Sequence, residues 1–381
     1  MNFRSYEIKD ICKIKSGKRL PKGTDFSEKP TKHKYIRARD IKNGKIDGSD
    51  LGYISEETQK KIERYIVNTN DIIITIAGTI GEVALVSKKF DGVNLTENAV
   101  RLTEFSKDVC PEFLAYILKS PERKEYMEQV AGGSAQPKLG IYKIEAIKVD
   151  LPDIQIQHKI ADILSAYDDL IENNQKQIKL LEEAAQRLYK EWFVDLRFPG
   201  HENTKIVDGV PEGWRRGLLK ELISVNYGKD HKKAPDDGNI PVYGSGGLMR
   251  KCNKSLFSGE AVLIPRKGSL NNIMYVDETF WTVDTMFYAT MKQPHTAIFV
   301  YFFVKAFDMY SMNIGAAVPS MTTKILDAMD VVIPDKETLE KFDKYAKVYF
   351  NKIKTLQGQN EQLKTARDLL LAKLMSGEVE V

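Results

Sequence analysis

Apolar and small side chains recur at alternating steps of four and three residues through the middle of the chain, between residues 151 and 200. The positions are Ile160, Leu164, Tyr167, Ile171, Ile178, Leu181, Ala185, Leu188 and Trp192, with Asn174 in the remaining place. Such spacing predicts a long helix with the heptad seam of a coiled coil. One helix cannot bury that seam alone, so the pattern also predicts a partner helix.

A partner lies 182 residues later in the same chain. Its seam positions are Phe342, Ala346, Tyr349, Ile353, Leu356, Asn360, Leu363, Arg367, Leu370 and Leu374. The two halves stay in one gapless register from Gly133–Pro137 and Gly315–Pro319 onward, which indicates an internal repeat. The alternative is a pair of unrelated amphipathic helices.

The two asparagines suggest how the helices pair. If Asn174 faces Asn360, an antiparallel register also brings Ile171 to Leu363 and Trp192 to Phe342. A buried asparagine at a seam position is a known device for fixing register. We therefore predict an intramolecular antiparallel coiled coil of roughly 35 to 40 residues per helix, about 50 to 60 Å long.

Segments on either side of the helices have the pattern of β-rich globular domains. Asp71–Ile76 is β-branched and predicts a buried strand, and Glu260–Ile264 is its counterpart in the second half. Lys32–Ile41 has the character of a strand, and Pro111–Ser120 that of a helix repeated at Ile298–Val304. The expected fold is α+β, with two β-rich globular domains in a pseudo-twofold arrangement, separated by the two long antiparallel helices. The boundaries are 1–151 and 199–333 for the domains, and 152–198 and 334–381 for the helical regions.

Charge is unevenly distributed although the net charge of the 381 residues is only +4. Residues 1–50 carry fourteen Lys and Arg against seven Asp and Glu. Residues 152–198 carry six Lys and Arg against nine Asp and Glu. Two basic domains held apart by a more acidic helix suit a polyanion bound at two places, although surface lysines can also serve only solubility. Three scattered cysteines, no signal peptide and no apolar run of membrane-spanning length favour a reduced cytoplasm.

Motifs for catalysis or metal binding are not found. There is no GxxxxGK[ST] loop for ATP and no polar-Pro-Pro-aromatic loop of a base methyltransferase. The five histidines lie far apart without ligand spacing, so we expect no metal site and no catalytic residues. Gly244–Gly247 is interpreted as a turn because no helix pattern follows it.

Five segments together resemble the DNA-specificity subunit of type I restriction–modification systems. Ile156–Leu164, with Asp168–Glu172 and Leu188–Phe193, is similar to the central helical region of that family. Arg367–Glu378 is similar to its C-terminal helical region, and Asp71–Gly81 to an element of its target-recognition domains. The resemblance covers the whole chain in the order of the family.

This resemblance implies a division of labour among subunits. Each target-recognition domain would read one half of a split sequence in double-stranded DNA, and the helices would set the gap. Methyltransferase subunits, two of them, would dock on the helices and hold S-adenosylmethionine. Restriction subunits with motor and nuclease activity would use ATP. This chain would hold no cofactor.

Candidate DNA contacts are cations for phosphates, and arginine or hydroxyl side chains for bases. In the first domain they are Lys18, Arg19, Lys32, Lys34, Arg37, Arg39, Thr79 and Lys138. In the second they are Lys229, Lys232, Lys233, Tyr243, Ser245, Arg250, Arg266, Lys267, Ser269 and Ser320. Arg37, Arg39 and Arg266 best suit bidentate recognition of guanine. The competing interpretations are a coiled-coil scaffold that binds only protein and a self-contained nucleic-acid enzyme.

Overall fold

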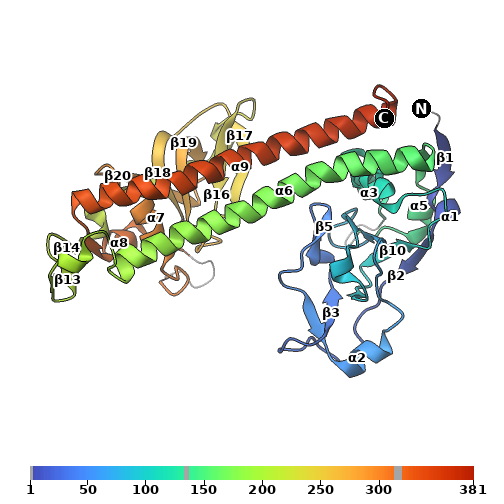
Figure 1. Cartoon of the computed structure of the whole chain (residues 1–381), viewed down its shortest axis with the longest axis horizontal. Helices are drawn as coiled ribbons and strands as arrows, with labels where there is room; N and C mark the ends of the chain where they lie inside the picture. Colours follow the sequence, from blue (N-terminus) through green and yellow to red (C-terminus); the bar gives the residue numbers. More distant parts are fainter. Residues whose placement is uncertain (1–2, 133–136, 313–319) are drawn as a thin grey trace. The chain divides into compact units, whose positions relative to one another are not determined.

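The computed structural model describes residues 3–132, 137–312 and 320–381. The chain divides into two compact units (Figure 1). The first unit comprises residues 1–172 and 360–381, and the second comprises residues 173–359. Residues of both long helices, 154–189 and 336–376, belong to both units.

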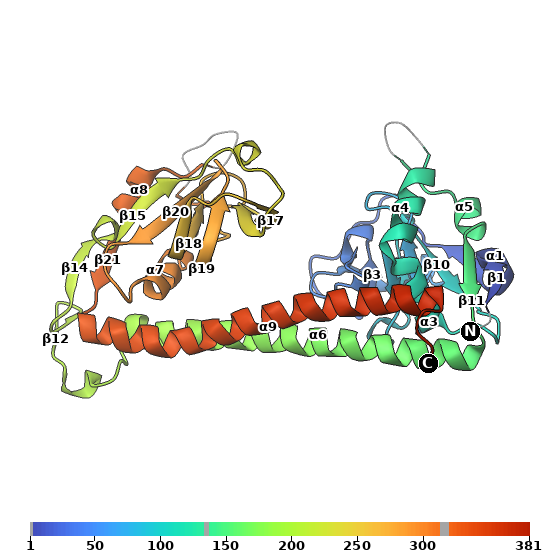
Figure 2. The ribbon, with the colours of Figure 1, turned by 90° about the horizontal axis from the view of Figure 1, so that it is seen from above.

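The first unit contains a four-stranded sheet and a three-stranded sheet. The larger has the order β2 (Lys13–Ser16), β10 (Ala99–Thr103), β7 (Ile72–Thr75) and β8 (Val83–Leu85). The smaller has the order β6 (Gly52–Ile54), β3 (His33–Ile36) and β9 (Asn94–Leu95), and a hairpin joins β4 (Ile41–Lys42) to β5 (Lys45–Ile46). The helices are α1 (Ile8–Ile11), α2 (Glu56–Lys61), α3 (Pro111–Lys119), α4 (Pro121–Val130) and α5 (Ile141–Glu145). Strands β1 (Arg4–Glu7) and β11 (Lys148–Leu151) pair beside the start of helix α6 (Ile154–Tyr189; Figures 1 and 2).

The second unit has one six-stranded sheet. Its order is β15 (Ile223–Tyr227), β20 (Met286–Met291), β18 (Phe257–Pro265), β19 (Met274–Thr282), β16 (Ile240–Gly244) and β17 (Gly247–Cys252). Two small sheets pair β12 (Ile206–Val207) with β13 (Val210–Pro211), and β14 (Arg215–Leu218) with β21 (Asp330–Ile333). Helix α7 (Ala297–Lys305) packs between the large sheet and the long helices (Figure 2), and α8 (Thr323–Asp327) precedes β21.

The two units repeat one topology in register. Antiparallel β10 and β7 place Val100 opposite Ile74, as β20 and β18 place Phe287 opposite Ile264. In addition, β3 runs parallel to β9 as β16 runs parallel to the end of β19. The α+β fold with a repeated domain, expected from the sequence, is confirmed. Residues 133–136 and 315–319, where the sequence repeat begins, lie outside the described residues.

The two long helices are α6 (Ile154–Tyr189) and α9 (Lys336–Ser376), and a π-helical turn at Lys190–Val194 continues α6. They run antiparallel and pack against each other in each unit (Figure 2). In the second unit the rings of Trp192 and Phe342 lie 5.8 Å apart, the pair that the predicted register requires. In the first unit Ile160, Leu164 and Leu374 share one buried cluster with helix α3.

The seam positions are mostly covered. Ile160, Leu164, Ile171, Ala185, Trp192, Phe342, Ala346, Ile353, Leu356 and Leu374 are buried. Asn174 and Asn360 are 9% and 5% exposed, unusually low fractions for polar side chains. Their pairing with each other stays a prediction.

The interpretation of Lys32–Ile41 as one strand is wrong in its second half. Strand β3 ends at Ile36, and Ala38–Asp40 forms a 3-10 turn, η1. The carboxylate of Asp40 accepts from the Arg37 backbone N–H at 2.8 Å and so holds the turn. Arg37 and Arg39 therefore belong to a turn and not to a strand edge.

Candidate nucleic-acid interface

Equivalent loops of the two units are held by the same backbone hydrogen bonds. The amide of Gly17 donates to Ala99 O at 3.1 Å, and that of Gly228 donates to Met286 O at 3.0 Å. A Cβ at Gly17 would overlap the carbonyl oxygen of Thr96, and one at Gly228 that of Val283. Glycine is required at both places because the two chain segments approach too closely for any side chain. The candidate residues Lys18 and Lys229 come directly after these two glycines in the chain.

A second loop is equivalent in the same way. Ala77 forms an isolated bridge with Lys138, and Lys267 forms one with Ser320. Four candidates of the sequence analysis therefore lie in matching positions: Lys138 and Thr79 in the first unit, Ser320 and Ser269 in the second.

Around the loop after β2, the first unit has a cavity of 570 Å³. Its lining includes the cationic residues Lys18, Arg19, Lys138 and Lys143. Glu97 is the acidic residue in the lining, and its carboxylate accepts from Arg19 Nε at 2.7 Å. Burial opposes ionisation of Glu97, but the hydrogen bonds from Arg19, from Thr96 and from the backbone, together with the charge of Arg19, outweigh it and lower the pKa of Glu97. A cationic cavity of this kind suits a phosphate or another anion.

Tyr142 and Lys143 of this cavity were not among the residues selected from the sequence. The Tyr142 side chain is 68% exposed, which is unusual for an aromatic residue, and Lys143 Nζ lies 5.8 Å from its ring centroid. An exposed ring beside cations can stack on a nucleobase. The sequence did not indicate that Tyr142 is exposed, because the residue stands in a helical pattern typical of a buried face.

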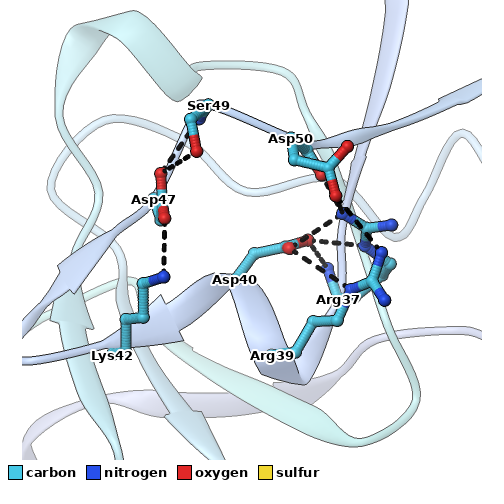
Figure 3. Close-up of polar contacts among 7 residues, drawn as sticks. All are labelled: Arg37, Arg39, Asp40, Lys42, Asp47, Ser49 and Asp50. Atoms are coloured by element: carbon cyan, nitrogen blue, oxygen red, sulfur yellow. Dashed lines mark hydrogen bonds and ion pairs between the residues drawn. The ribbon is translucent and has the colours of Figure 1, made fainter. Parts of the chain in front are cut away.

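The arginines of turn η1 form an ion-pair cluster in the first unit (Figure 3). Arg37 donates from Nε and Nη2 to the two carboxylate oxygens of Asp40, each at 2.9 Å. Its side chain is only 18% exposed, whereas that of Arg39 is 67% exposed and reaches Asp50 at 3.3 Å. Arg37 thus stabilises the turn, and Arg39 has the more accessible guanidinium.

Other cations of the first unit are ion-paired or half-buried. Lys42 pairs with Asp47 at 2.7 Å, and the hydrogen bond from Lys42 lowers the pKa of Asp47 well below its usual value. Lys32 pairs with Glu56 at 2.9 Å. Lys34 lies on β3 opposite Tyr53 and is half-buried.

In the second unit, Arg266 and Lys267 stand at the turn after β18. The Arg266 guanidinium lies over the ring of Tyr227, 5.6 Å from its centroid. Ser245 is near, since its carbonyl accepts from Asn272 Nδ2 at 2.9 Å and its hydroxyl lies where a Cβ on Gly268 would meet it at 2.7 Å. Tyr227 was missed in the sequence although it directly precedes the Gly228-Lys229 turn.

The remaining candidates of the second unit differ in accessibility. Lys229, Lys232 and Lys233 are exposed. Tyr243 donates to Glu278 at 2.5 Å, and burial, together with this hydrogen bond, raises the pKa of the Tyr243 phenol. Arg250 donates from Nη2 to the carbonyls of His231 and Ala234 at 2.5 and 2.7 Å, so it stabilises a loop of its own domain.

In the part of the chain that the structure describes, no group of three or more His, Cys, Asp or Glu is placed to hold a metal ion. Across the same residues, no helix has both the length and the apolar character to cross a membrane.

Comparison with known proteins gives concordant matches. The family model described as "Type I restriction modification DNA specificity domain" matches residues 2–183 and 211–365. The type I restriction enzyme MjaIX specificity subunit of Methanocaldococcus jannaschii is 27% identical over 370 residues, which cover 86% of this chain and 82% of that protein. The HindI specificity subunit of Haemophilus influenzae is 22% identical over 479 residues, covering 99% and 100%.

A solved structure shares the fold. The type I restriction-modification system S subunit from M. genitalium superposes with a TM-score of 0.60 at 19% identity, covering 98% of this chain and 96% of that one. At this identity the likeness concerns the fold alone.

Proposed function

Because the chain belongs to the family of type I restriction–modification DNA specificity subunits, we propose that it reads a bipartite target in double-stranded DNA. Residues 1–151 and 199–333 are assigned as target-recognition domains that each read one half-site. Residues 152–198 and 334–381 are assigned as the helical spacer. The chain is assigned no catalytic residues of its own.

One observation carries this proposal: the two domains present different side chains from matching backbone positions. Lys138 pairs with Ala77 where Ser320 pairs with Lys267. A repeated scaffold with different loop chemistry is suited to reading two different sequences. A scaffold that bound only protein would have no need for cationic loops at matching places.

The long helices support a role as spacer. At 1.5 Å per residue, the 36 residues of α6 and the 41 residues of α9 correspond to about 54 and 62 Å, more than one DNA turn of about 34 Å. The unread gap of the target would follow from this length.

The helices also offer surfaces for partner subunits. Leu170 and Leu180 of α6 are 51% and 64% exposed, and Tyr345, Val348 and Leu369 of α9 are 56% to 65% exposed. Exposed large apolar side chains of this kind favour protein–protein contact. We assign these faces to two methyltransferase subunits, which would hold S-adenosylmethionine, while ATP would be used by restriction subunits.

The experiment that tests the function is a footprint on duplex DNA with the methyltransferase subunits present. Sequencing of methylated bases in the host genome would first provide the target. Two protected patches with an unprotected gap are expected. Uniform protection without sequence preference, or none, would favour the alternative of a protein-binding scaffold, and DNA modification by the chain alone would favour a self-contained enzyme.

A further inference from the structure

Ile76 and Arg266 occupy the same backbone position in the two units. The amide of Ile76 donates to Asn98 O at 2.8 Å, and that of Arg266 donates to Thr285 O at 2.8 Å. In each unit the next amide donates to the same carbonyl, at 3.3 Å from Ala77 and 3.2 Å from Lys267. These shared backbone hydrogen bonds form a local frame that holds the position in the same way in both units.

The third bond of this frame is also repeated. The carbonyl of Ile76 accepts from Leu139 N at 2.9 Å, and that of Arg266 accepts from Met321 N at 2.9 Å. The adjoining strand ends match as well, because Ser16 and Tyr227 each precede the close-packed glycine of their unit. The backbone is the same, and the side chains are different.

In the first unit these side chains leave a hollow. Ile76 is only 4% exposed, and both Ile76 and Ser16 line the cavity of 570 Å³. In the second unit the same two positions carry Arg266 and Tyr227, whose guanidinium and ring lie against each other at 5.6 Å. Arg266 Nη1 donates to the carbonyl of Asp284 at 3.3 Å, which occupies one of the five N–H donors of the guanidinium.

We propose that Arg266, oriented by the ring of Tyr227, is the residue of the second domain that determines specificity for a guanine in its half-site. This inference rests on the proposed function. A guanidinium presents two parallel donors to the O6 and N7 acceptors of guanine, and a stacked ring reduces the conformational freedom lost on binding. Tyr227 is 54% exposed, so the pair stands at the surface of the domain.

The first domain reads its half-site differently at this position. Ile76 has no hydrogen-bond donor in its side chain, and the charged residues of the cavity lining around it are Lys18, Arg19, Glu97, Lys138 and Lys143. The same backbone position therefore presents a guanidinium with two parallel donors to one half-site and only an apolar side chain to the other.

The test uses the full chain assembled with its methyltransferase subunits and the target obtained by sequencing methylated bases. The informative variant is Arg266→Ile, because the equivalent frame already holds isoleucine in the first domain. Arg266→Lys keeps the charge without the planar fork, and Tyr227→Ser introduces the residue of the equivalent position. Arg216→Ile, an exposed arginine of β14, is the matched control.

Binding of each complex is measured by competition with duplexes that carry every base substitution in both half-sites. Arg266→Ile should reduce discrimination at one G·C pair by about 5- to 150-fold and leave the other half-site and the gap unchanged. Arg266→Lys should reduce discrimination at the same base pair with a smaller loss of total affinity. Tyr227→Ser should reduce discrimination at that base pair only in part. Arg216→Ile should behave as wild type.

Other outcomes overturn the inference. Equal weakening on target and random DNA by Arg266→Ile makes the residue a phosphate contact, and an unchanged preference in folded Arg266→Ile and Arg266→Lys removes it from the interface. If thermal melting shows that the Arg266→Ile variant is not folded, the same binding comparison is made with the Arg266→Lys variant and decides the question. A wild-type complex without any bipartite preference would instead refute the proposed function itself.

Discussion

The buried ion pair between Arg101 and Asp71 allows a quantitative test of how the first domain is stabilised. Arg101 Nη1 donates to Asp71 Oδ2 at 3.1 Å, and the two side chains are 8% and 5% exposed. The same carboxylate oxygen accepts from Asn68 N at 2.9 Å. Arg101→Met would remove the charge partner and leave a buried carboxylate with its backbone donor alone.

Breaking a buried pair by removing one partner costs about 3 to 5 kcal/mol. For a unit of this size, that free energy corresponds to a decrease in Tm of about 6 to 20 °C. The second unit shows that the fold does not need the pair, because β18 and β20 place Ala261 and Tyr288 at the equivalent positions. We therefore expect the double variant Asp71→Ala/Arg101→Met to recover to within about 2 kcal/mol of wild type.

The assay is thermal and chemical unfolding of the single and double variants, with hydrogen exchange to locate the change in β7 and β10. The reasoning would be refuted if Arg101→Met unfolded like wild type, or if the double variant were as unstable as the single one.

Three further variants test other parts of the structure. Phe342→Ala should destabilise the helix pair by about 3 to 5 kcal/mol because the ring is fully buried, whereas Val348→Ala on the exposed face should cost less than about 1 kcal/mol in the same melts. Gly17→Ala should destabilise the first unit, since a Cβ overlaps a backbone carbonyl, and a normal melting temperature would contradict this. Burial lowers the pKa of Lys119 from 10.5 to about 8, so the unfolded chain binds more protons between these values and stability rises with pH across them. Lys119→Met should raise Tm at pH 7 and abolish this rise, and a Tm difference independent of pH would exclude the explanation.

Much of the architecture was accessible from local patterns. The four-three spacing from Ile160 to Trp192 predicted a helix with a partner, and the repeat 182 residues later located that partner. The contact between Trp192 and Phe342 agrees with the predicted register. These features are periodic, so the regular geometry of a helix or strand converts residue spacing directly into a buried face.

The chemistry of individual cations depended on contacts that no spacing encodes. Arg37 and Arg39 looked equivalent in the sequence, but Asp40 binds the guanidinium of Arg37 on both sides of its fork and leaves Arg39 more exposed. A cation's availability is decided by which acceptors neighbouring loops bring to it, and that is set by the folded chain.

The sequence by itself determined the repeated α+β architecture, the helix seam and the family. Only the tertiary structure placed Arg266 against Tyr227. Segments far apart in the chain meet there, since the frame of Arg266 combines the end of β18 with Thr285 and Met321. Local periodicity reports which face of an element is buried, whereas a recognition surface is assembled from loops whose juxtaposition exists only after folding.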